Sequence, residues 1–217
     1  MGWLMALVFF ISGSGVAWGL TPEEIADGVQ RRYREIRDLQ ADFHQQTTLP
    51  MMDRVTEGKG RLYLKLPGKM RWDYLEGQKK AVIINEKTMW FYEPLEKQVT
   101  VTDLTRLAHS REMLTFITGM GDLKKDFLLD SSQSPHETRE GYVTIHLLPR
   151  EKNSQWTHLR LLVDPKTFQV AQTAFEGVQG DRTVIDFKNI RTDLGLSDDL
   201  FKFEIPQGVD VLHYPPR

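Results

Sequence analysis

The chain has 217 residues, of which 28 are Lys or Arg, 30 are Asp or Glu, and 40% are hydrophobic. This balance of charge excludes a nucleic-acid-binding polycation and a disordered polyelectrolyte, and the length suits one domain with a sizeable core. The chain contains no cysteine, which excludes thiol catalysis, disulfide bonds and zinc–thiolate sites.

Residues 1–19 contain no charged side chain, and the apolar run from Trp3 to Ile11 is followed by small residues that end at Gly19. This pattern predicts a cleaved signal peptide, because the apolar run is shorter than the roughly 20 residues of a transmembrane helix. We therefore expect export to the bacterial periplasm and a single domain over residues 20–217. No cysteine follows the signal to accept a lipid, so a soluble mature protein is expected.

The first predicted element of that domain is an amphipathic helix that starts at Thr21. Pro22 occupies the first helical position and Glu24 the third, which is the pattern of a capping box. Apolar residues then recur at spacings of three and four, while arginines occupy the other face. This apolar stripe consists of Ile25, Val29, Tyr33, Ile36 and Leu39. The helix is therefore expected to cover an apolar surface.

Short runs of alternating or apolar residues follow, separated by turns such as Pro67-Gly68, and they predict antiparallel strands. The predicted strands span residues 41–49, 57–66, 69–75, 80–85, 88–93, 97–102, 142–148, 156–163, 168–175 and 183–190. The fold class that fits is mainly β with α: an open, incomplete antiparallel β-barrel of about 11 strands. Residues 131–141 are predicted to form a polar loop.

Between the two groups of strands, residues 104–121 contain apolar side chains at helical spacing, and Gly119 and Gly121 can end a helix. One or two short helices are predicted there. Together with the N-terminal helix they are expected to form a helical lid over the concave face of the sheet. A curved sheet under such a cover encloses an apolar pocket as readily as a solid core.

The sequence offers little for an enzyme. The six histidines lie on different predicted elements, and His136 begins only half of a zinc-protease motif, because Glu140 stands where the second histidine is required. No nucleophile elbow, phosphate loop or dinucleotide-binding motif occurs. We therefore predict no catalytic residues, no metal site and no cofactor.

The central stretch, residues 57–102, reads E-G-x-G-x-L-x-x-K-x-P-x-x-x-R-W, then a strand, then W-F-Y-x-P-x-x-x-Q-V-T. The motif residues are Glu57, Gly58, Gly60, Leu62, Lys65, Pro67, Trp72, Trp90, Tyr92, Pro94 and Gln98. With Phe43 and Gln45 before it and the segments 122–127 and 203–211 after it, this pattern resembles the periplasmic lipoprotein carrier family, LolA. The resemblance covers nearly the whole predicted mature chain.

The resemblance implies an unclosed antiparallel barrel with a helical lid. It also implies a periplasmic carrier that takes acylated lipoproteins from an inner-membrane ABC exporter and ferries their acyl chains to the outer membrane, without covalent chemistry. An outer-membrane lipoprotein receptor is a further implied partner; a monomer that binds no nucleic acid is expected. The alternative is a lipid- or lipoprotein-sensing module of the same fold. Such sensors usually carry an additional domain, for which the predicted mature chain has no room.

The acyl-chain cavity is predicted from the aromatic strands and from the apolar stripe of the lid. Its predicted lining residues are Phe43, Leu64, Met70, Trp72, Trp90, Tyr92, Met113, Phe116 and Ile117. Because side chains alternate along a strand, Trp90 and Tyr92 share one face and Met89 and Phe91 the other. The sequence leaves open which pair faces the cavity.

One position departs from the family pattern. Members commonly have an arginine directly before the strand-ending proline, where it hydrogen-bonds the lid shut, whereas this chain has Leu66. Leucine cannot donate such bonds, so Leu66 is predicted to be a lid-control position with weaker or different control. Arg61 or Arg71 could take over this role only if its head group reaches the predicted helices at 107–120.

Overall fold

The computed structural model describes residues 20–106, 122–130, 132, 136–137, 141–151 and 155–214. The strands are β1 (Asp38–Leu49), β2 (Arg54–Lys65), β3 (Lys69–Gly77), β4 (Lys80–Asn85), β5 (Thr88–Glu93), β6 (Gln98–Asp103), β7 (Phe127–Leu129), β8 (His136–Glu137), β9 (Val143–Pro149), β10 (Trp156–Val163), β11 (Val170–Gly177), β12 (Arg182–Thr192) and β13 (Asp210–Tyr214). The helices are α1 (Pro22–Glu35) and α3 (Leu123–Asp126), with 3₁₀ turns η1 (Pro50–Met52), η2 (Leu104–Arg106) and η3 (Asp198–Phe201). None of the helices in these ranges has the length and apolarity needed to cross a membrane.

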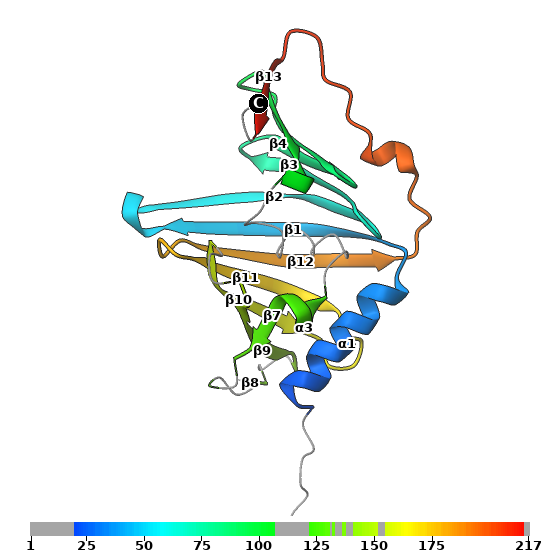
Figure 1. The fold of residues 1–217 in the computed structure, drawn as a ribbon, viewed down its shortest axis with the longest axis vertical. Coiled ribbons are helices and arrows are strands. Elements are labelled where there is room, and N and C mark those ends of the chain that lie inside the picture. Colours follow the sequence, from blue (N-terminus) through cyan, green and yellow to red (C-terminus); the bar gives the residue numbers. More distant parts are fainter. Residues whose placement is uncertain are drawn as a thin grey trace, which may run out of the picture.

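All thirteen strands belong to one sheet, in the order β13-β6-β5-β4-β3-β2-β1-β12-β11-β10-β9-β7, with β8 paired to β9 off this path. The strands pair antiparallel except β13, which runs parallel to β6. The end strands β13 and β7 have no pairing with each other in this order, so the sheet is open (Figure 1). The predicted open, mainly antiparallel sheet is confirmed.

Three short strands were not expected from the sequence. β7 and β8 have only three and two residues, and β13 lies in what reads as an extended tail. Each forms by pairing with a neighbouring strand and has no alternation of apolar and polar residues of its own. The structure therefore has more strands than the predicted number of about 11. The prediction of a polar loop over residues 131–141 is wrong at His136 and Glu137, which form β8 and pair with β9. Residues 1–19 and 107–121, which hold the predicted signal peptide and most of the predicted lid, lie outside the described residues.

β1 joins the two halves of the sheet. It pairs with β2 on one side and with β12 on the other, so that Phe43 lies opposite both Gly60 and Phe187. Directly opposed residues on antiparallel strands point to the same face. We call the face that carries Phe43 the inner face and the other the outer face. Asp42 and His44 alternate with Phe43 and therefore belong to the outer face.

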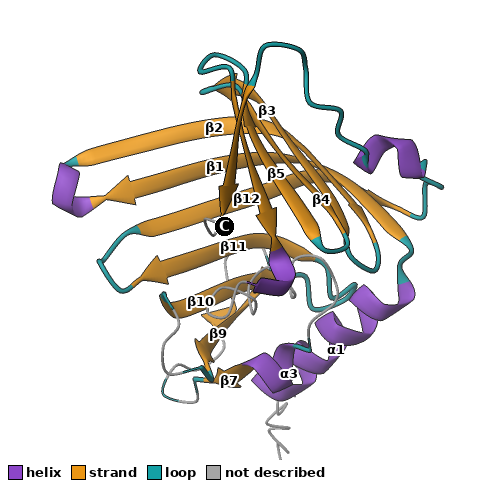
Figure 2. Ribbon diagram, turned by 45° about the horizontal axis from the view of Figure 1, so that its top comes forward, coloured by secondary structure: helices purple, strands orange, loops and turns teal. Residues whose placement is uncertain are grey.

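The main hydrophobic core lies on the inner face and includes one side of α1. Ile25, Ala26 and Val29 of α1 are fully buried in the same cluster as Ile145 and Leu161 of the sheet. Burying each large side chain contributes about 1.5–3 kcal/mol, so packing and not intrinsic propensity holds this 14-residue helix. Figure 2 shows α1 beside α3 near β7 and β9.

The start of α1 agrees with the predicted capping box. The Thr21 backbone N–H donates to Glu24 Oε2 at 2.8 Å, and the Glu24 N–H donates to Thr21 Oγ1 at 3.2 Å. The helix ends at Glu35, however, and Leu39 already belongs to β1. The predicted helical stripe was thus too long at its C-terminal end, although Leu39 is buried in the same core.

After β12 the chain crosses the outer face to reach β13, and we call residues 193–209 the strap (Figure 1). Its start is held by Asp38, whose side chain is 3% exposed. The Asp38 carboxylate accepts hydrogen bonds from the backbone N–H groups of Leu194, Gly195 and Leu196, at 2.6, 2.9 and 3.1 Å. Lys65 Nζ donates to the Leu196 carbonyl at 2.8 Å. The end of β2 and the start of β1 thus hold the strap together.

The Asp38 contacts predict a large effect on stability. Replacing Asp38→Ala leaves three N–H groups of part-buried hydrogen bonds without their acceptor, and we expect a loss of about 3 kcal/mol in the free energy of unfolding. Urea denaturation at neutral pH measures it. Asp38→Asn keeps one acceptor oxygen and should lose less, and the exposed Asp199→Ala should change little. Equal stabilities of Asp38→Ala and Asp199→Ala would contradict this role.

Candidate functional site

The inner face is an almost continuous apolar surface that runs from β4 through β1 to β7. Its buried side chains are Leu39, Ala41, Phe43, Leu62, Leu64, Met70, Trp72, Ile84, Phe127, Ile145, Leu147, Leu159, Leu161, Val163, Phe175 and Ile185. Strand register brings them together, because Trp72 lies opposite Leu62, and Leu161 lies opposite both Ile145 and Thr173. A surface of this kind offers dispersion contacts to a hydrocarbon ligand and few hydrogen bonds.

Aromatic rings gather at the centre of this face. The Phe43 ring lies 4.9 Å from both the Trp72 and the Tyr74 rings, and Phe187 lies 6.3 Å from Trp72. Gly60 makes room for them: a Cβ at this position would lie 2.9 Å from the Phe43 ring and 1.8 Å from the Asp73 carbonyl oxygen. The glycine pair of the central motif therefore has a packing role at Gly60.

The indole N–H of Trp72 finds no polar partner within the described part of the chain. Its Nε1 is buried, and no described residue accepts a hydrogen bond from it. A buried indole N–H usually finds an acceptor, and leaving it unpaired costs free energy. The position is consistent with a surface shaped for apolar contact, in which the ring faces and not the N–H group make the interactions.

The inner face becomes polar toward the end of β1. The Tyr74 hydroxyl donates to Gln45 Oε1 at 2.6 Å, and the Thr47 and Thr183 hydroxyls lie 2.9 Å apart. Lys80 Nζ lies 4.6 Å from the centre of the Tyr74 ring, a cation–π contact. Burial raises the pKa of Tyr74 to about 12. Along its strands the inner face thus passes from hydrocarbon side chains to a hydrogen-bonded rim.

The structure places the predicted cavity residues in three groups. Phe43, Leu64, Met70 and Trp72 are buried together on the inner face. The predicted lid residues Met113, Phe116 and Ile117 lie outside the described residues.

The third group, Trp90 and Tyr92, lies on the other face. Trp90 pairs with Ile83, whereas Met89 pairs with Ile84 and Phe91 with Val82, the residues level with Met70 and Trp72. Trp90 and Tyr92, predicted among the lining residues, therefore do not share a face with Trp72, and Met89 and Phe91 take the inner face. Only the register through two hairpins decides this choice.

Trp90 and Tyr92 instead form an outer cluster with the strap. The Phe203 ring lies 6.3 Å from Trp90 and 5.3 Å from Tyr92. Phe201 of the strap and Ile83 and Val99 of the sheet are 0% exposed. These aromatic side chains of the central motif therefore secure the strap, and sequence reasoning missed this use because Phe203 is remote in the chain.

Leu66, the predicted lid-control position, is half-buried and packs against the main core, while its N–H donates to the Arg37 carbonyl at 2.8 Å. Neither arginine proposed as its replacement faces inward. Arg61 lies 3.5 Å from Asp42, and Arg71 Nε donates to both Asp73 carboxylate oxygens, at 2.9 and 3.0 Å. Both guanidinium groups are thus held on the outer face, and the structure gives no support to either as a substitute latch.

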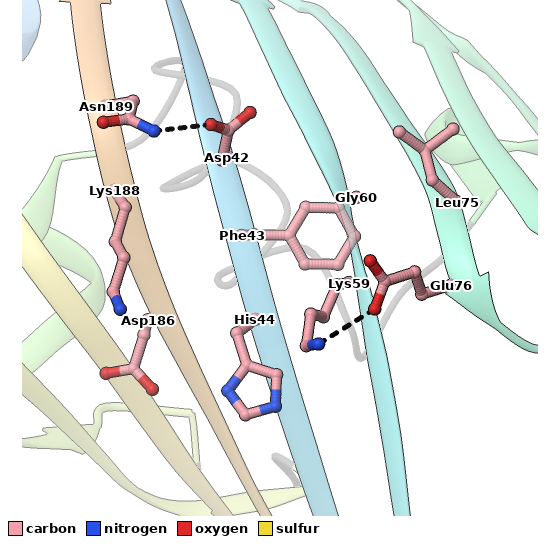
Figure 3. A pocket seen from close by; sticks show the side chains of 10 residues that line it. All are labelled: Asp42, Phe43, His44, Lys59, Gly60, Leu75, Glu76, Asp186, Lys188 and Asn189. Carbon is pink, nitrogen blue, oxygen red and sulfur yellow. Dashed lines mark hydrogen bonds and ion pairs between the residues drawn. The ribbon is translucent and has the colours of Figure 1, made fainter.

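A pocket of about 610 Å³ opens where β12, β1, β2 and β3 lie side by side (Figure 3). It is lined by Asp42, Phe43, His44, Lys59, Gly60, Leu75, Glu76, Asp186, Lys188 and Asn189. Its charged groups largely satisfy one another, since Lys59 binds Glu76 at 2.8 Å and Asn189 donates to Asp42 at 2.8 Å. These bonds lower the pKa values of Glu76 and Asp42. With three carboxylates and two ammonium groups, this lining does not strongly favour a ligand of either sign.

Among the described residues, no group of three or more His, Asp or Glu side chains is placed to hold a metal ion. The inner face, with its apolar side chains and aromatic cluster, is the candidate binding surface. A family model described as "Outer membrane lipoprotein carrier protein LolA" matches residues 34–204 of the chain. The chain belongs to this family. The match includes β1, the central strands and most of the strap.

Individual relatives agree over nearly the full length. An outer-membrane lipoprotein carrier protein of Azotobacter vinelandii is 31% identical over 204 residues, which cover 92% of this chain and 95% of that protein. One of Chromohalobacter salexigens is 27% identical over 215 residues, covering 97% and 96%. A crystal structure of an uncharacterized conserved protein from Thermus thermophilus has a TM-score of 0.55 at 16% identity and covers 88% of this chain and 98% of that one, a likeness of fold alone.

The contact between Tyr74 and Gln45 predicts a pH effect. Because the pKa of Tyr74 is raised to about 12 in the folded state, its contribution to stability is complete below pH 10 and is lost as the pH rises from 10 toward 12. Tyr74→Phe should cost about 1 kcal/mol at pH 8 through the lost hydrogen bond. The difference in free energy of unfolding between the unsubstituted protein and Tyr74→Phe should narrow above pH 10 in urea titrations. A difference that stays constant up to pH 11 would contradict this reading of Tyr74.

Proposed function

We propose that this member of the family is a carrier that shields the acyl chains of lipoproteins against its inner face. The observation that carries the proposal is the apolar inner face itself, with the aromatic cluster of Phe43, Trp72 and Phe187 at its centre. Transfer from water contributes about 0.8 kcal/mol per methylene, so acyl chains cannot cross an aqueous space unshielded. A face of side chains without reactive groups supplies this shielding and needs no covalent chemistry.

The proposed place of action is the periplasm, reached by means of a signal peptide at residues 1–19 that is removed from a single domain at 20–217. Its proposed partners are acylated lipoproteins, an inner-membrane ABC exporter that loads them, and an acceptor at the outer membrane. The names of the relatives from Azotobacter and Chromohalobacter support an outer-membrane lipoprotein as cargo. The open sheet supports loading at its side, because its end strands β13 and β7 do not pair with each other in the strand order.

The proposed acyl-binding residues are those that the structure places on the inner face: Phe43, Leu64, Met70, Trp72, Met89, Phe91 and Phe187. Met113, Phe116 and Ile117 stay in the proposal as residues of a covering lid. Leu66 stays as a position of lid control. Because its side chain joins the apolar core and donates no hydrogen bond, we propose that the lid is held by apolar contact, which acyl chains can replace.

A matched pair of substitutions on β12 tests the acyl-binding face. Phe187 points to the inner face and Val184 to the outer face of the same strand, and both are partly buried. Phe187→Gln places an unpaired amide among acyl chains and should weaken binding of a triacylated lipopeptide about tenfold. Val184→Gln should leave the affinity unchanged. Titration with the lipopeptide, using displacement of a fluorescent fatty acid, measures both.

Thermal unfolding of each variant is the control for folding. Equal affinities of folded Phe187→Gln, Val184→Gln and unsubstituted protein would contradict acyl binding on this face. Loss of affinity in Val184→Gln alone would move the ligand to the outer face. Failure of the unsubstituted protein to bind any acylated peptide would contradict the carrier proposal as a whole.

A further inference from the structure

The turn between β1 and β2 carries apolar side chains that nothing in the described chain covers. Met51 is 82% exposed, Met52 72% and Val55 56%. η1 holds the two methionines in one 3₁₀ turn that starts at Pro50, and Figure 1 shows this turn at the far end of the long β1–β2 hairpin. We call Pro50, Met51, Met52 and Val55 the methionine tip.

The strand next to the hairpin extends this apolar surface and adds positive charge. Thr48 lies between Val55 on β2 and Arg182 on β12, while Arg54 lies opposite Leu49. Val178, in the turn before β12, is 63% exposed. Arg54 and Arg182 are exposed, and neither forms an ion pair with another described residue. Two available guanidinium groups thus flank the methionine tip.

No nearby carboxylate of a described residue forms an ion pair with these arginines, and Glu176, opposite Arg182 on β11, lies 3.7 Å from His158 instead. Glu57 accepts a hydrogen bond from Gln46 at 3.0 Å and lies 3.7 Å from His44, while Asp181 folds back over Gly177, where a Cβ would meet its carboxylate at 2.2 Å. Asp53 is exposed in the left-handed conformation, with φ of 45°, which ends the turn. The arginines therefore remain able to bind anionic groups.

The size and shape of the methionine tip favour one kind of partner. A stable protein interface buries about 800 Å² on each partner, far more than a few side chains at a hairpin end supply. Methionine is flexible and polarizable, which suits a fluid and irregular environment. Guanidinium groups bind phosphate in a bidentate manner. A protruding apolar turn with arginines beside it therefore fits the interface of a phospholipid bilayer, where hydrocarbon and phosphate lie side by side.

We propose that the methionine tip inserts into the surface of a phospholipid bilayer, with Arg54 and Arg182 on lipid phosphates. This inference goes beyond acyl binding, because it concerns a different surface and needs no cargo. So few apolar side chains give weak and reversible attachment. A carrier that must leave each membrane after loading or delivery requires such reversibility.

A fluorescent label tests insertion directly, since the chain has no native cysteine. Met52→Cys, labelled with an environment-sensitive dye, should shift its emission to the blue with vesicles of phosphatidylethanolamine and phosphatidylglycerol. Nitroxide-labelled lipids should quench it. The control is Leu194→Cys with the same label, because Leu194 is 42% exposed just beyond the opposite end of β12. Its emission should not change; equal shifts at both positions, or none at Met52→Cys, would overturn the proposal.

A double substitution provides the second arm. Met51→Ser with Met52→Ser should weaken vesicle binding about tenfold, since burial of large apolar side chains supplies the attachment. It should leave lipopeptide affinity unchanged, which separates this outcome from a failure of acyl binding. Leu194→Ser should bind vesicles normally. Unchanged vesicle binding by the double variant would overturn the proposal. If the double variant instead lost self-association, the tip would be a contact between two copies of the chain. If it lost only the transfer of lipopeptide to vesicles that contain protein, the tip would bind a protein partner; either result would also overturn the proposal.

Discussion

The structure depends on the pairing of β1 with both β2 and β12. This register places Phe43 opposite Gly60 and Phe187, and so joins strands from the two ends of the chain into one surface. The period of two along β1 then sends apolar side chains to the inner face and charged ones to the outer face. A slip by one residue would exchange the faces and place Asp42 and His44 among the apolar side chains.

The second constraint is that the protein keeps part of its hydrophobic stabilisation away from the inner face. The strap brings Phe203 to the outer side of β5, where its ring packs against Trp90 and Tyr92, and it also buries Phe201. Asp38 and Lys65 hold the start of the strap from the end of the β1–β2 pair. This outer cluster stabilises β4 and β5 by contacts that a ligand on the inner face would not disturb. An acyl-binding surface needs such support, because its side chains must be able to give up contacts within the protein for contacts with acyl chains.

Local patterns predicted much of this fold, and long-range pairing accounts for what they missed. The capping box of Thr21 and Glu24 gave the start of α1, and alternation along β1 correctly separated Phe43 from Asp42. The inner pair on β5 could not be predicted, because Met89 and Trp90 are both apolar and only the register through β3 and β4 orients them. β13 forms a strand because its backbone pairs with the edge of β6. Trp90 holds the strap through its contact with Phe203, and the residue spacing in the central motif gives no sign of this distant contact.

The central claim is that acyl chains lie against the inner face. Site-specific photo-cross-linking in intact cells tests it most directly, with a photoreactive amino acid at Leu159 on the inner face of β10 or at Trp90 on the outer face of β5. The account predicts adducts with acylated lipoproteins from position 159 and none from position 90, and no adducts with a lipoprotein whose acylated cysteine has been replaced. Adducts from position 90 but not from position 159, or adducts that do not depend on acylation, would contradict it.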